Sequence, residues 1–305
     1  MQQEYNPKNA EIKVWVNGLC ARHEAKVSVF DSAVQGGDAV WEGIRIYKGY
    51  AFMLEQHIDR MHYSAHALAF ANVPSREEIK NAVFSTLQAN QMHDNAHIRL
   101  TLTRGEKITS GMDPRLNQAG CTLIVLAEHK PPVYDNTQGI RLITSAIRRN
   151  NPQFLDSKIH HNNLLNNILA KIEANVAGAD DAVMLDILGF VAETNATNLF
   201  MIKNGQLFTP HPDACLPGIT RKLVLDMAAE LGLPAIERNL SLTEFYNADE
   251  VFTTGTMGEL TPVHEIDGRQ IINRANADIL SRLQQHFTTK IPVYGVKLPF
   301  LTKDQ

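Results

Sequence analysis

The stretch Asp156-Ser157-Lys158-Ile159-His160-His161-Asn162-Asn163 places a lysine directly before a run of apolar residues with helical spacing. These residues recur at i, i+1, i+4, i+5, i+8 and i+12, namely Leu164, Leu165, Ile168, Leu169, Ile172 and Val176. Their spacing predicts a helix with one apolar stripe turned toward a core. We expect Lys158 to lie beside this apolar surface, where desolvation favours the neutral amine that attacks carbonyl groups. The alternative interpretation of Lys158 is a solvated surface charge.

The length and composition are those of a globular protein with two domains. The chain has 305 residues, and single cores seldom grow much beyond about 250 residues. Hydrophobic residues make up 44% and charged residues 20%. The formal net charge of −4 gives no electrostatic reason for a nucleic-acid partner or an anionic membrane surface, so we predict neither.

The location of the protein is predicted from its first residues and its cysteines. Residues 1–6 contain neither a basic region nor an apolar run, so they do not resemble a signal peptide. No run approaches the ~18 apolar residues of a membrane span. Cys20, Cys121 and Cys215 are few, odd in number and far apart, which favours free thiols in a reducing compartment. The prediction is a cytoplasmic protein.

No metal site is predicted. The chain contains neither a CxxC nor an HExxH motif. His62 and His66 lie four residues apart on an expected helix and could pair on a metal, but no third ligand with suitable spacing accompanies them. A solvated helix face is the preferred interpretation.

The pattern of elements predicts an α+β protein with a small α/β domain over 1–130, a linker over 131–138 and a larger domain over 139–305. Successive prolines at 131 and 132 stiffen the linker. Alternation and turn residues predict strands at 12–17, 27–30, 44–47, 51–53, 98–103, 122–126, 140–144, 182–186, 190–192, 198–202, 206–208 and 250–254. Besides the helix after Lys158, helices are expected near 54–70, 76–90, 217–232 and 274–288.

Several residues together could hold an aldehyde cofactor that carries a phosphate. Lys158 supplies the amine, and Glu193, at the end of a strand, supplies a carboxylate that would keep a pyridine nitrogen protonated. The residues 218–220 open a helix, where free N–H groups bind phosphate. Gly255-Thr256 offers further N–H groups and a hydroxyl, and Arg60 a guanidinium fork. Taken singly, each could be a surface charge, a helix cap or a turn.

The order and spacing of these residues resemble the class IV, fold-type IV pyridoxal-phosphate aminotransferases, the group that holds the branched-chain and D-amino-acid aminotransferases. The resemblance rests on Trp41-Glu42-Gly43-Ile44-Arg45 and Leu216-Pro217-Gly218-Ile219-Thr220-Arg221. It also rests on the stretches 15–18, 57–60, 193–198, 248–252 and 255–263, together with Lys158, and it spans about residues 12 to 270.

The resemblance implies a small α/β domain, a larger β-barrel-like domain with helices, and pyridoxal 5'-phosphate as cofactor. It implies that Lys158 forms the Schiff base with the cofactor and then transfers protons, and that Glu193 pairs with the pyridine nitrogen. The remaining implied cofactor-binding residues are Arg60, Asn198, Gly218, Ile219, Thr220, Gly255 and Thr256. A homodimer or a higher homo-oligomer is implied as well.

The implied reaction transfers an amino group between an amino acid and a 2-oxo acid, most simply a branched-chain L-amino acid and 2-oxoglutarate, in a ping-pong mechanism. The implied substrate-binding residues are Trp41, Arg45, His97, Arg99, Arg115 and Met257. Arg99 matches the branched-chain enzymes, whereas Arg115 matches the arginine that grips the α-carboxylate in the D-amino-acid enzymes. The sequence departs from the branched-chain pattern at Gly36 and Asn163, where those enzymes usually carry tyrosines.

Two other activities remain open on the sequence. One is a transaminase for D-amino acids or (R)-amines, which the Arg115 loop favours. The other is the related aminodeoxychorismate lyase, which releases pyruvate without a keto-acid acceptor.

Overall fold

A computed structural model describes residues 4–273 and 278–301, which form two compact units. The N-terminal unit holds the chain up to Pro131, the segment Ile159–Asn163 and the chain from Ile291. The C-terminal unit holds Pro132–Lys158 and Leu164–Lys290. The predicted boundaries differ from this division in two ways: the segment after Lys158 and the C-terminal stretch belong to the first unit, and the linker from Pro132 belongs to the second.

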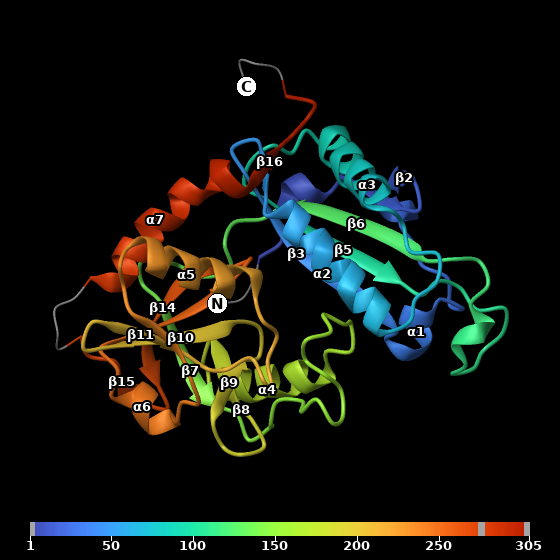
Figure 1. The fold of residues 1–305 in the computed structure, drawn as a ribbon. Coiled ribbons are helices and arrows are strands. Elements are labelled where there is room, and N and C mark those ends of the chain that lie inside the picture. The colour runs from blue at the N-terminus through green and yellow to red at the C-terminus, as the bar shows by residue number, and fades with distance from the viewer. Residues whose placement is uncertain (1–3, 274–277, 302–305) are drawn as a thin grey trace. The chain divides into compact units, whose positions relative to one another are not determined.

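The N-terminal unit is built on an antiparallel sheet of seven strands in the order β16-β4-β3-β5-β6-β1-β2 (Figure 1). The strands are β1 (Lys13–Val16), β2 (Leu19–Ala21), β3 (Ala39–Tyr47), β4 (Tyr50–Phe52), β5 (Ala96–Thr103), β6 (Thr122–His129) and β16 (Gly295–Lys297). The helices are α1 (Ser32–Gly36), α2 (Leu54–Ala67) and α3 (Arg76–Ala89), with 3-10 turns η1 (Pro7–Asn9), η2 (Arg22–Glu24) and η3 (Pro114–Leu116). Asn17 and Gly18 connect β1 and β2 in a hairpin, and Asn17 takes a positive φ of 50° there.

Helices α2 and α3 cover one face of this sheet. Ile58 of α2 and Val83 of α3 belong to one buried cluster with Ile44 of β3 and Leu100 of β5. Successive side chains of a strand point to opposite faces. Trp41 and Arg45 of β3 therefore lie on the sheet face away from these helices, as do Arg99 and His97, since the register pairs Gly43 with Arg99 and Arg45 with His97.

The segment Ile159–Asn163 joins the N-terminal unit by backbone hydrogen bonds to β3. Trp41 donates its N–H to the carbonyl of His160, and Asn162 donates its N–H to the carbonyl of Ala39. The segment thus pairs with the part of the β3 edge that the short strand β4 does not reach. This pairing explains why a stretch so far along the chain clusters with the first unit, which local sequence pattern does not show.

The C-terminal unit is built on a mixed sheet of nine strands. The order is β12-β11-β10-β13-β14-β7-β8-β9, with β15 paired to β14. The strands are β7 (Ile140–Thr144), β8 (Asp181–Leu185), β9 (Val191–Thr194), β10 (Asn198–Lys203), β11 (Gln206–Thr209), β12 (Ala235–Glu237), β13 (Glu250–Gly255), β14 (Glu259–Ile266) and β15 (Arg269–Gln270). β9 also lies beside β10, so the sheet curls back on itself around Leu142, Val183, Leu199 and Val251. The prediction of a barrel-like unit agrees with this arrangement.

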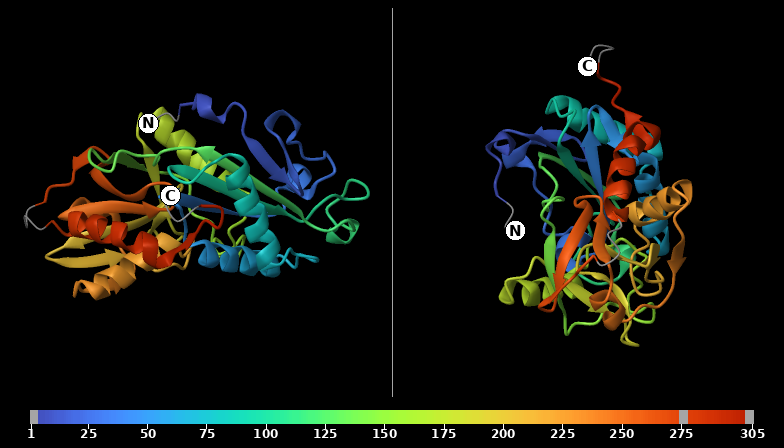
Figure 2. Two further views of the ribbon diagram at one scale, coloured as in Figure 1. Left: turned by 90° about the horizontal axis from the view of Figure 1, so that it is seen from above. Right: turned by 90° about the vertical axis from the view of Figure 1, so that its left-hand side faces the viewer.

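The helices of this unit are α4 (Leu165–Val176), α5 (Ile219–Glu230) and α6 (Leu242–Tyr246), and α7 (Ile279–Tyr294) belongs to it up to Lys290. The predicted start of the last helix at 274 lies outside the described residues. The helix after Lys158 exists, but the predicted orientation of its apolar stripe is wrong. Leu165, Ile168, Leu169, Ile172 and Val176 are exposed, and the helix instead packs on β8 through Ala170 and Ala174. The backbone of α4 is the yellow-green helix in Figure 2. Small residues allow this close approach, and periodicity alone does not tell which stripe meets the chain's own core.

The predicted strand at 27–30 is also wrong. The structure has a loop there, in which Val29 and Phe30 are exposed. The carbonyl of Phe30 accepts a hydrogen bond from Lys107, and Ser32 donates its N–H to the carbonyl of Gly105. This loop therefore directs its backbone groups to the loop after β5 instead of to a sheet. The long loop between β5 and β6 is therefore hydrogen-bonded to the chain around Phe30 and Ser32.

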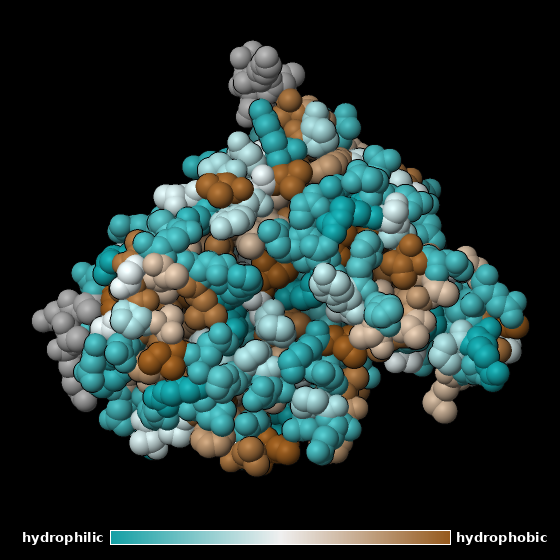
Figure 3. Space-filling view, viewed as in Figure 1, coloured by the Kyte–Doolittle hydropathy of each residue, from teal (hydrophilic) through white to brown (hydrophobic). Residues whose placement is uncertain are grey.

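No helix among the described residues is both long enough and apolar enough to span a membrane. Figure 3 shows the hydrophobic residues of the viewed face as separate patches among hydrophilic ones.

Candidate active site

Lys158 ends the first segment of the C-terminal unit, in a turn before α4. Its backbone N–H donates to the Asp156 carboxylate at 3.0 Å, and the hydroxyl of the buried Ser157 donates to the carbonyl of Asn150 at 3.2 Å. The turn is therefore fixed, whereas the lysine side chain is exposed. The expectation of an amine desolvated by the apolar stripe is wrong, because that stripe faces outward. Burial raises the pKa of the Cys215 thiol, and the Lys158 charge is among those that oppose this rise.

Glu193 is a buried carboxylate on β9 that faces an arginine. Arg149 donates its Nε to Glu193 Oε1 at 2.6 Å, and both side chains are less than a tenth exposed. Burial raises the pKa of Glu193, while the Arg149 charge and the N–H of Leu216 oppose that rise. The sequence analysis missed Arg149, because nothing in the local pattern of the loop after β7 links it to a carboxylate on β9.

Asn198 connects Glu193 to the start of α5. Its Nδ2 donates to Glu193 Oε2 at 3.3 Å and to the carbonyl of Leu216 at 2.8 Å, and its Oδ1 accepts the N–H of Gly218 at 3.2 Å. A Cβ on Gly218 would lie 2.2 Å from Asn198 Oδ1, so a larger residue here would displace the Asn198 amide. The structure thus brings together three residues that the sequence analysis had proposed separately.

The first turn of α5 is a candidate site for an anion. Gly218 is the N-cap, and no side chain of the described residues caps the helix. The N–H groups of Ile219 and Thr220 therefore lie at the positive end of a 12-residue helix without a side-chain cap. This is the arrangement in which helix N-termini bind phosphate.

The second predicted phosphate turn, Gly255-Thr256, follows β13. A Cβ on Gly255 would lie 3.1 Å from Cγ2 of Thr197, so the two segments approach closely there. The turn is also held by the N–H of Val133, which donates to the carbonyl of Met257 at 3.0 Å. Thr254, which the sequence analysis did not single out, carries a buried hydroxyl that finds no hydrogen-bond partner in the part of the chain that the structure describes.

Arg60 lies on α2 of the N-terminal unit, where it forms a two-pronged ion pair with Glu42. Its Nε and Nη2 donate to the two carboxylate oxygens at 2.8 and 2.7 Å. Its Nη1 is buried and has no hydrogen-bond partner within residues 4–273 and 278–301. Such a donor is expected to have an acceptor, which a bound anion would supply.

Trp41 and Arg99 form one cluster on the sheet face away from α2 and α3. The Arg99 guanidinium lies 3.4 Å above the centre of the Trp41 ring, and its Nη2 donates to Asn162 Oδ1 at 2.9 Å. The ring of His160 contacts the Trp41 ring, with centroids 4.2 Å apart. Burial lowers the pKa of Arg99 to about 10, which leaves it positively charged at neutral pH.

Arg45 and His97 are buried side chains of the N-terminal unit. Arg45 is 1% exposed and donates to the carbonyl of Lys130 at 2.5 Å. Burial and the neighbouring charges of Lys130 and Arg45 lower the pKa of His97 to about 3, so this imidazole is neutral. Its Nε2 is buried and lacks a partner among the residues that the structure places.

Arg115 is not part of this cluster. It lies in η3 with an exposed side chain, and its guanidinium binds Asp113 two residues earlier. The Arg115 hydrogen bonds lower the pKa of Asp113 to about 2. Of the two arginines proposed as carboxylate anchors, the structure thus brings only Arg99 to Trp41.

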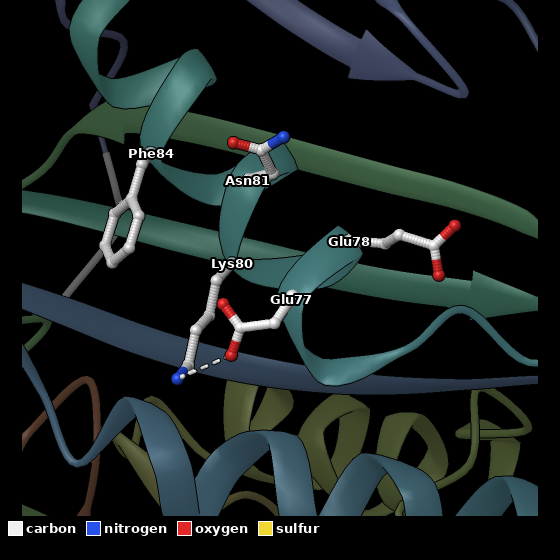
Figure 4. Close-up of a pocket in the computed structure, with 5 residues that line it drawn as sticks. All are labelled: Glu77, Glu78, Lys80, Asn81 and Phe84. Carbon is white, nitrogen blue, oxygen red and sulfur yellow. Dashed lines mark hydrogen bonds and ion pairs between the residues drawn. The ribbon is translucent and has the colours of Figure 1, made fainter.

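A shallow hollow on α3 is lined by Glu77, Glu78, Lys80, Asn81 and Phe84 (Figure 4). Lys80 pairs with Glu77 at 3.4 Å, and none of the predicted site residues lines this hollow. Among the described residues, no cluster of three or more metal-ligating side chains occurs, and His62 hydrogen-bonds to the carbonyl of Pro74.

Comparison with known proteins identifies the family of this chain. Residues 39–266 match the model of the family described as Amino-transferase class IV. A protein of Arabidopsis thaliana named branched-chain-amino-acid aminotransferase-like protein 2 is 60% identical over 96% of this chain and 53% of its own length. The chain therefore spans about half the length of this relative. A putative branched-chain-amino-acid aminotransferase of Methanocaldococcus jannaschii is 42% identical over 94% of the chain and 99% of its own length.

The fold has solved counterparts. The T.th. branched-chain amino acid aminotransferase, complexed with N-(5'-phosphopyridoxyl)-L-glutamate, superposes with a TM-score of 0.87 at 31% identity and covers 94% of this chain and 99% of its own. The Escherichia coli branched-chain amino acid aminotransferase superposes with a TM-score of 0.86 at 31% identity, covering 92% of this chain and 95% of its own. The predicted fold-type IV architecture is confirmed.

Proposed function

Because this chain belongs to the class IV aminotransferases, we propose that it is a pyridoxal-phosphate-dependent transaminase. It exchanges an amino group between a branched-chain L-amino acid and 2-oxoglutarate in two half-reactions. The substrate class is supported by the printed names of the relatives and solved structures. The observation that carries the proposal is the link from Glu193 through Asn198 to the uncapped start of α5.

The residues present fit pyridoxal 5'-phosphate. Its phosphate needs donors, and the N–H groups of Ile219 and Thr220 have no capping side chain among the described residues. Gly255 and Thr256 supply the second turn. Its pyridine nitrogen needs an anionic acceptor, which the buried Glu193 provides. When bound, this cofactor supplies the electron sink for the reaction at the substrate α-carbon.

The chain's own residues then hold and move protons. With the cofactor bound, Lys158 Nζ would be the amine that holds its aldehyde, and the same amine would accept and return the proton of the substrate α-carbon. Its exposure leaves it free to make this movement. Glu193 keeps a proton on the ring nitrogen, and Arg149 keeps Glu193 oriented by its 2.6 Å hydrogen bond.

We propose that Arg99 binds the substrate carboxylate, with Trp41 and His97 next to the substrate. Arg99 is stacked on Trp41 and tied to Asn162 by one nitrogen, which fixes the guanidinium and leaves its other N–H groups for a carboxylate. Gly36 and Asn163 replace the expected tyrosines, so we expect a pocket wall that is open on one side and more polar on the other. Arg115, bound to Asp113, gives the D-amino-acid activity less support.

A substrate panel tests this function. We expect the purified protein to transfer the amino group of L-leucine, L-isoleucine and L-valine to 2-oxoglutarate, as measured by glutamate formation. Arg99→Ala should raise the KM for 2-oxoglutarate about tenfold to a hundredfold, the scale of one charge-assisted hydrogen bond of ~1.5–3 kcal/mol. Turnover of D-amino acids that Arg115→Ala abolishes would instead establish the D-specific activity. Pyruvate release from an aminated chorismate without a keto acid would establish the lyase.

We also propose that the protein is a homodimer in which the exposed stripe of α4 contacts a second copy. The stripe consists of the exposed side chains of Leu165, Ile168, Leu169, Ile172 and Val176. A contiguous apolar surface of this kind is typical of a protein–protein contact. Its spacing of i, i+3, i+4, i+7 and i+11 is that of a helix packing on another surface. A two-fold dimer lets this stripe meet its own copy, since such an interface uses the same patch twice.

Measuring the molecular mass of the protein in solution tests the proposed dimer. Ile168→Glu combined with Ile172→Glu should shift the equilibrium toward the monomer by about a hundredfold or more, because two carboxylates would be buried without partners. Tyr63→Glu, at an exposed residue of α2, is the matched control and should leave the mass unchanged. A wild-type chain that sediments as a monomer at micromolar concentration would contradict the proposal.

A cytoplasmic location is proposed on the state of the cysteines. Cys20, Cys121 and Cys215 are all free thiols in the structure, which is typical of a reducing compartment.

A further inference from the structure

The chain just before β7 lies along the turn between β13 and β14, which we call the cofactor turn (residues 255–259). The N–H of Val133 donates to the carbonyl of Met257 at 3.0 Å. A Cβ on Gly258 would lie 3.2 Å from Cδ2 of Tyr134, so the tyrosine ring lies against this glycine. Both segments belong to the C-terminal unit, so this contact lies within one compact unit.

Asn136 ties the same segment to the start of β14. Its Oδ1 accepts a hydrogen bond from the Thr261 hydroxyl at 2.8 Å, and its Nδ2 donates to Glu259 Oε2 at 3.3 Å. Gln284 of α7 donates its Nε2 to the carbonyls of Asn136 and Leu260, at 3.3 and 3.0 Å. Residues 133–136 therefore hold the cofactor turn through backbone and side-chain contacts together.

The cofactor turn needs such support, because one of its residues has a strained backbone. Glu259 takes a φ of 58°, in the left-handed region that favours glycine. A residue with a side chain keeps this conformation only where the surrounding structure fixes it. The contacts with residues 133–136 supply this restraint, so the conformation of the turn depends on where that segment is held.

Tyr134 is itself fixed by a buried carboxylate on β8. Its hydroxyl donates to Asp181 Oδ2 at 2.5 Å, and Asp181 is 1% exposed. Lys171 Nζ and Asn195 Nδ2 each donate to Asp181 Oδ1 at 3.1 Å, so the carboxylate is held from both sides. Burial and the Asp181 charge raise the pKa of Tyr134, which keeps its hydroxyl protonated as a donor.

We propose that Tyr134 is a positioning residue for the cofactor turn. Held by Asp181 at its hydroxyl, its ring supports Gly258 and keeps the N–H and hydroxyl of Thr256 where they bind the phosphate group of pyridoxal 5'-phosphate. Tyr134 acts through the turn, since Asp181 engages its hydroxyl and Gly258 its ring. This inference rests on the proposed function, in which Gly255 and Thr256 supply a phosphate-binding turn.

The test compares two ligands of the cofactor-free protein, pyridoxal 5'-phosphate and pyridoxal, which lacks the phosphate. Tyr134→Phe keeps the ring against Gly258 and removes only the hydroxyl. The variant should fold, because Asp181 keeps its hydrogen bonds from Lys171 and Asn195. We expect the dissociation constant of pyridoxal 5'-phosphate to rise about threefold to thirtyfold and that of pyridoxal by less than about twofold.

Tyr246→Phe is the matched control. The Tyr246 hydroxyl also donates to an aspartate of the C-terminal unit, Asp267 Oδ2, at 2.7 Å. Asp267 follows the end of β14 that lies away from the cofactor turn. This variant loses the same kind of hydrogen bond, and it should change neither dissociation constant.

A second variant covers the case in which Tyr134→Phe fails to fold. Asn136→Ala removes the hydrogen bonds to Thr261 and Glu259 and leaves Tyr134 in place. It should weaken the binding of pyridoxal 5'-phosphate by about threefold to tenfold, again without a matching loss for pyridoxal.

Several results would overturn the inference. Equal losses for both ligands in Tyr134→Phe would mean that Tyr134 only stabilises the fold, and an unchanged constant for pyridoxal 5'-phosphate would mean that the turn does not depend on it. An equal loss in Tyr246→Phe would mean that the effect is not specific to the cofactor turn. If Tyr134→Phe is unfolded, an unchanged ratio of the two constants in Asn136→Ala excludes the positioning role. Wild-type protein that binds neither ligand would instead refute the proposed cofactor.

Discussion

Lys158→Ala will reduce transaminase turnover by about 10²–10⁴-fold or more, because the chain then lacks the amine that moves the proton. The protein should still fold, since the Lys158 side chain is exposed and no core packing depends on it. It should also still take up pyridoxal 5'-phosphate, because the donors at the start of α5 remain. The absorbance of the lysine-bound cofactor should disappear, and this is measured on the same sample as the rate.

Two controls make the Lys158 result specific. Lys158→Arg keeps the positive charge but presents no neutral amine, so it should lose as much activity as Lys158→Ala. Lys26→Ala, at an exposed lysine of the loop before α1, should keep full activity. A small primary amine added to Lys158→Ala should restore part of the proton transfer. Turnover close to wild type in Lys158→Ala would rule out the whole proposed function.

Glu193→Ala is expected to lower the free energy of unfolding by about 3–5 kcal/mol, which is the cost of removing one partner of a buried ion pair. Arg149 would be left as a buried cation that has lost this carboxylate, since its Nε donates to Glu193 and its Nη1 to the neutral Asn166. Turnover should fall as well, because the ring nitrogen of the cofactor loses its anionic partner. The measurements are urea unfolding of the cofactor-free protein and the transamination rate.

The double variant separates the two roles of Glu193. Glu193→Leu with Arg149→Met replaces the ion pair by apolar side chains of similar size and should be more stable than either single variant. It should nevertheless remain inactive. If the double variant were as unstable as the sum of the two single variants, the ion pair would not be the source of the loss. If it were active, Glu193 would have no role in the chemistry.

Much of the fold follows from local sequence signals. The turn at Asn17-Gly18 and the hairpin across Asn204-Gly205 follow from residues that tolerate positive φ, and both form. The helix predicted near 76–90 forms as α3, and the structure shows a capping box of Ser75 and Glu78 at its start. The strand predicted at 27–30 fails because its backbone groups bind another loop, and no local pattern reports a partner so distant.

Some residues of the candidate site could likewise be predicted from local sequence signals, and others could not. Lys158, Glu193 and the two glycine turns could be named in advance, since each lies at the boundary of an element with a recognisable pattern. Arg149 and the hydrogen bonds of Glu42 could not, because the partners are far apart in the chain. Glu42 meets His160 across 118 positions. The sequence also could not choose between Arg99 and Arg115, and the stacking of Arg99 on Trp41 now favours Arg99.

The sequence by itself determined the family, the order of most strands and helices and the residue types that the chemistry needs, because these depend on local spacing and turn chemistry. Only the tertiary structure decided that the apolar stripe of α4 faces outward and that Arg149 pairs with Glu193. It alone shows that Arg60 is held by Glu42 with one donor to spare among the described residues. The reason is physical: burial and ion pairing depend on which distant surfaces meet, and hydrophobic periodicity carries no information about the partner.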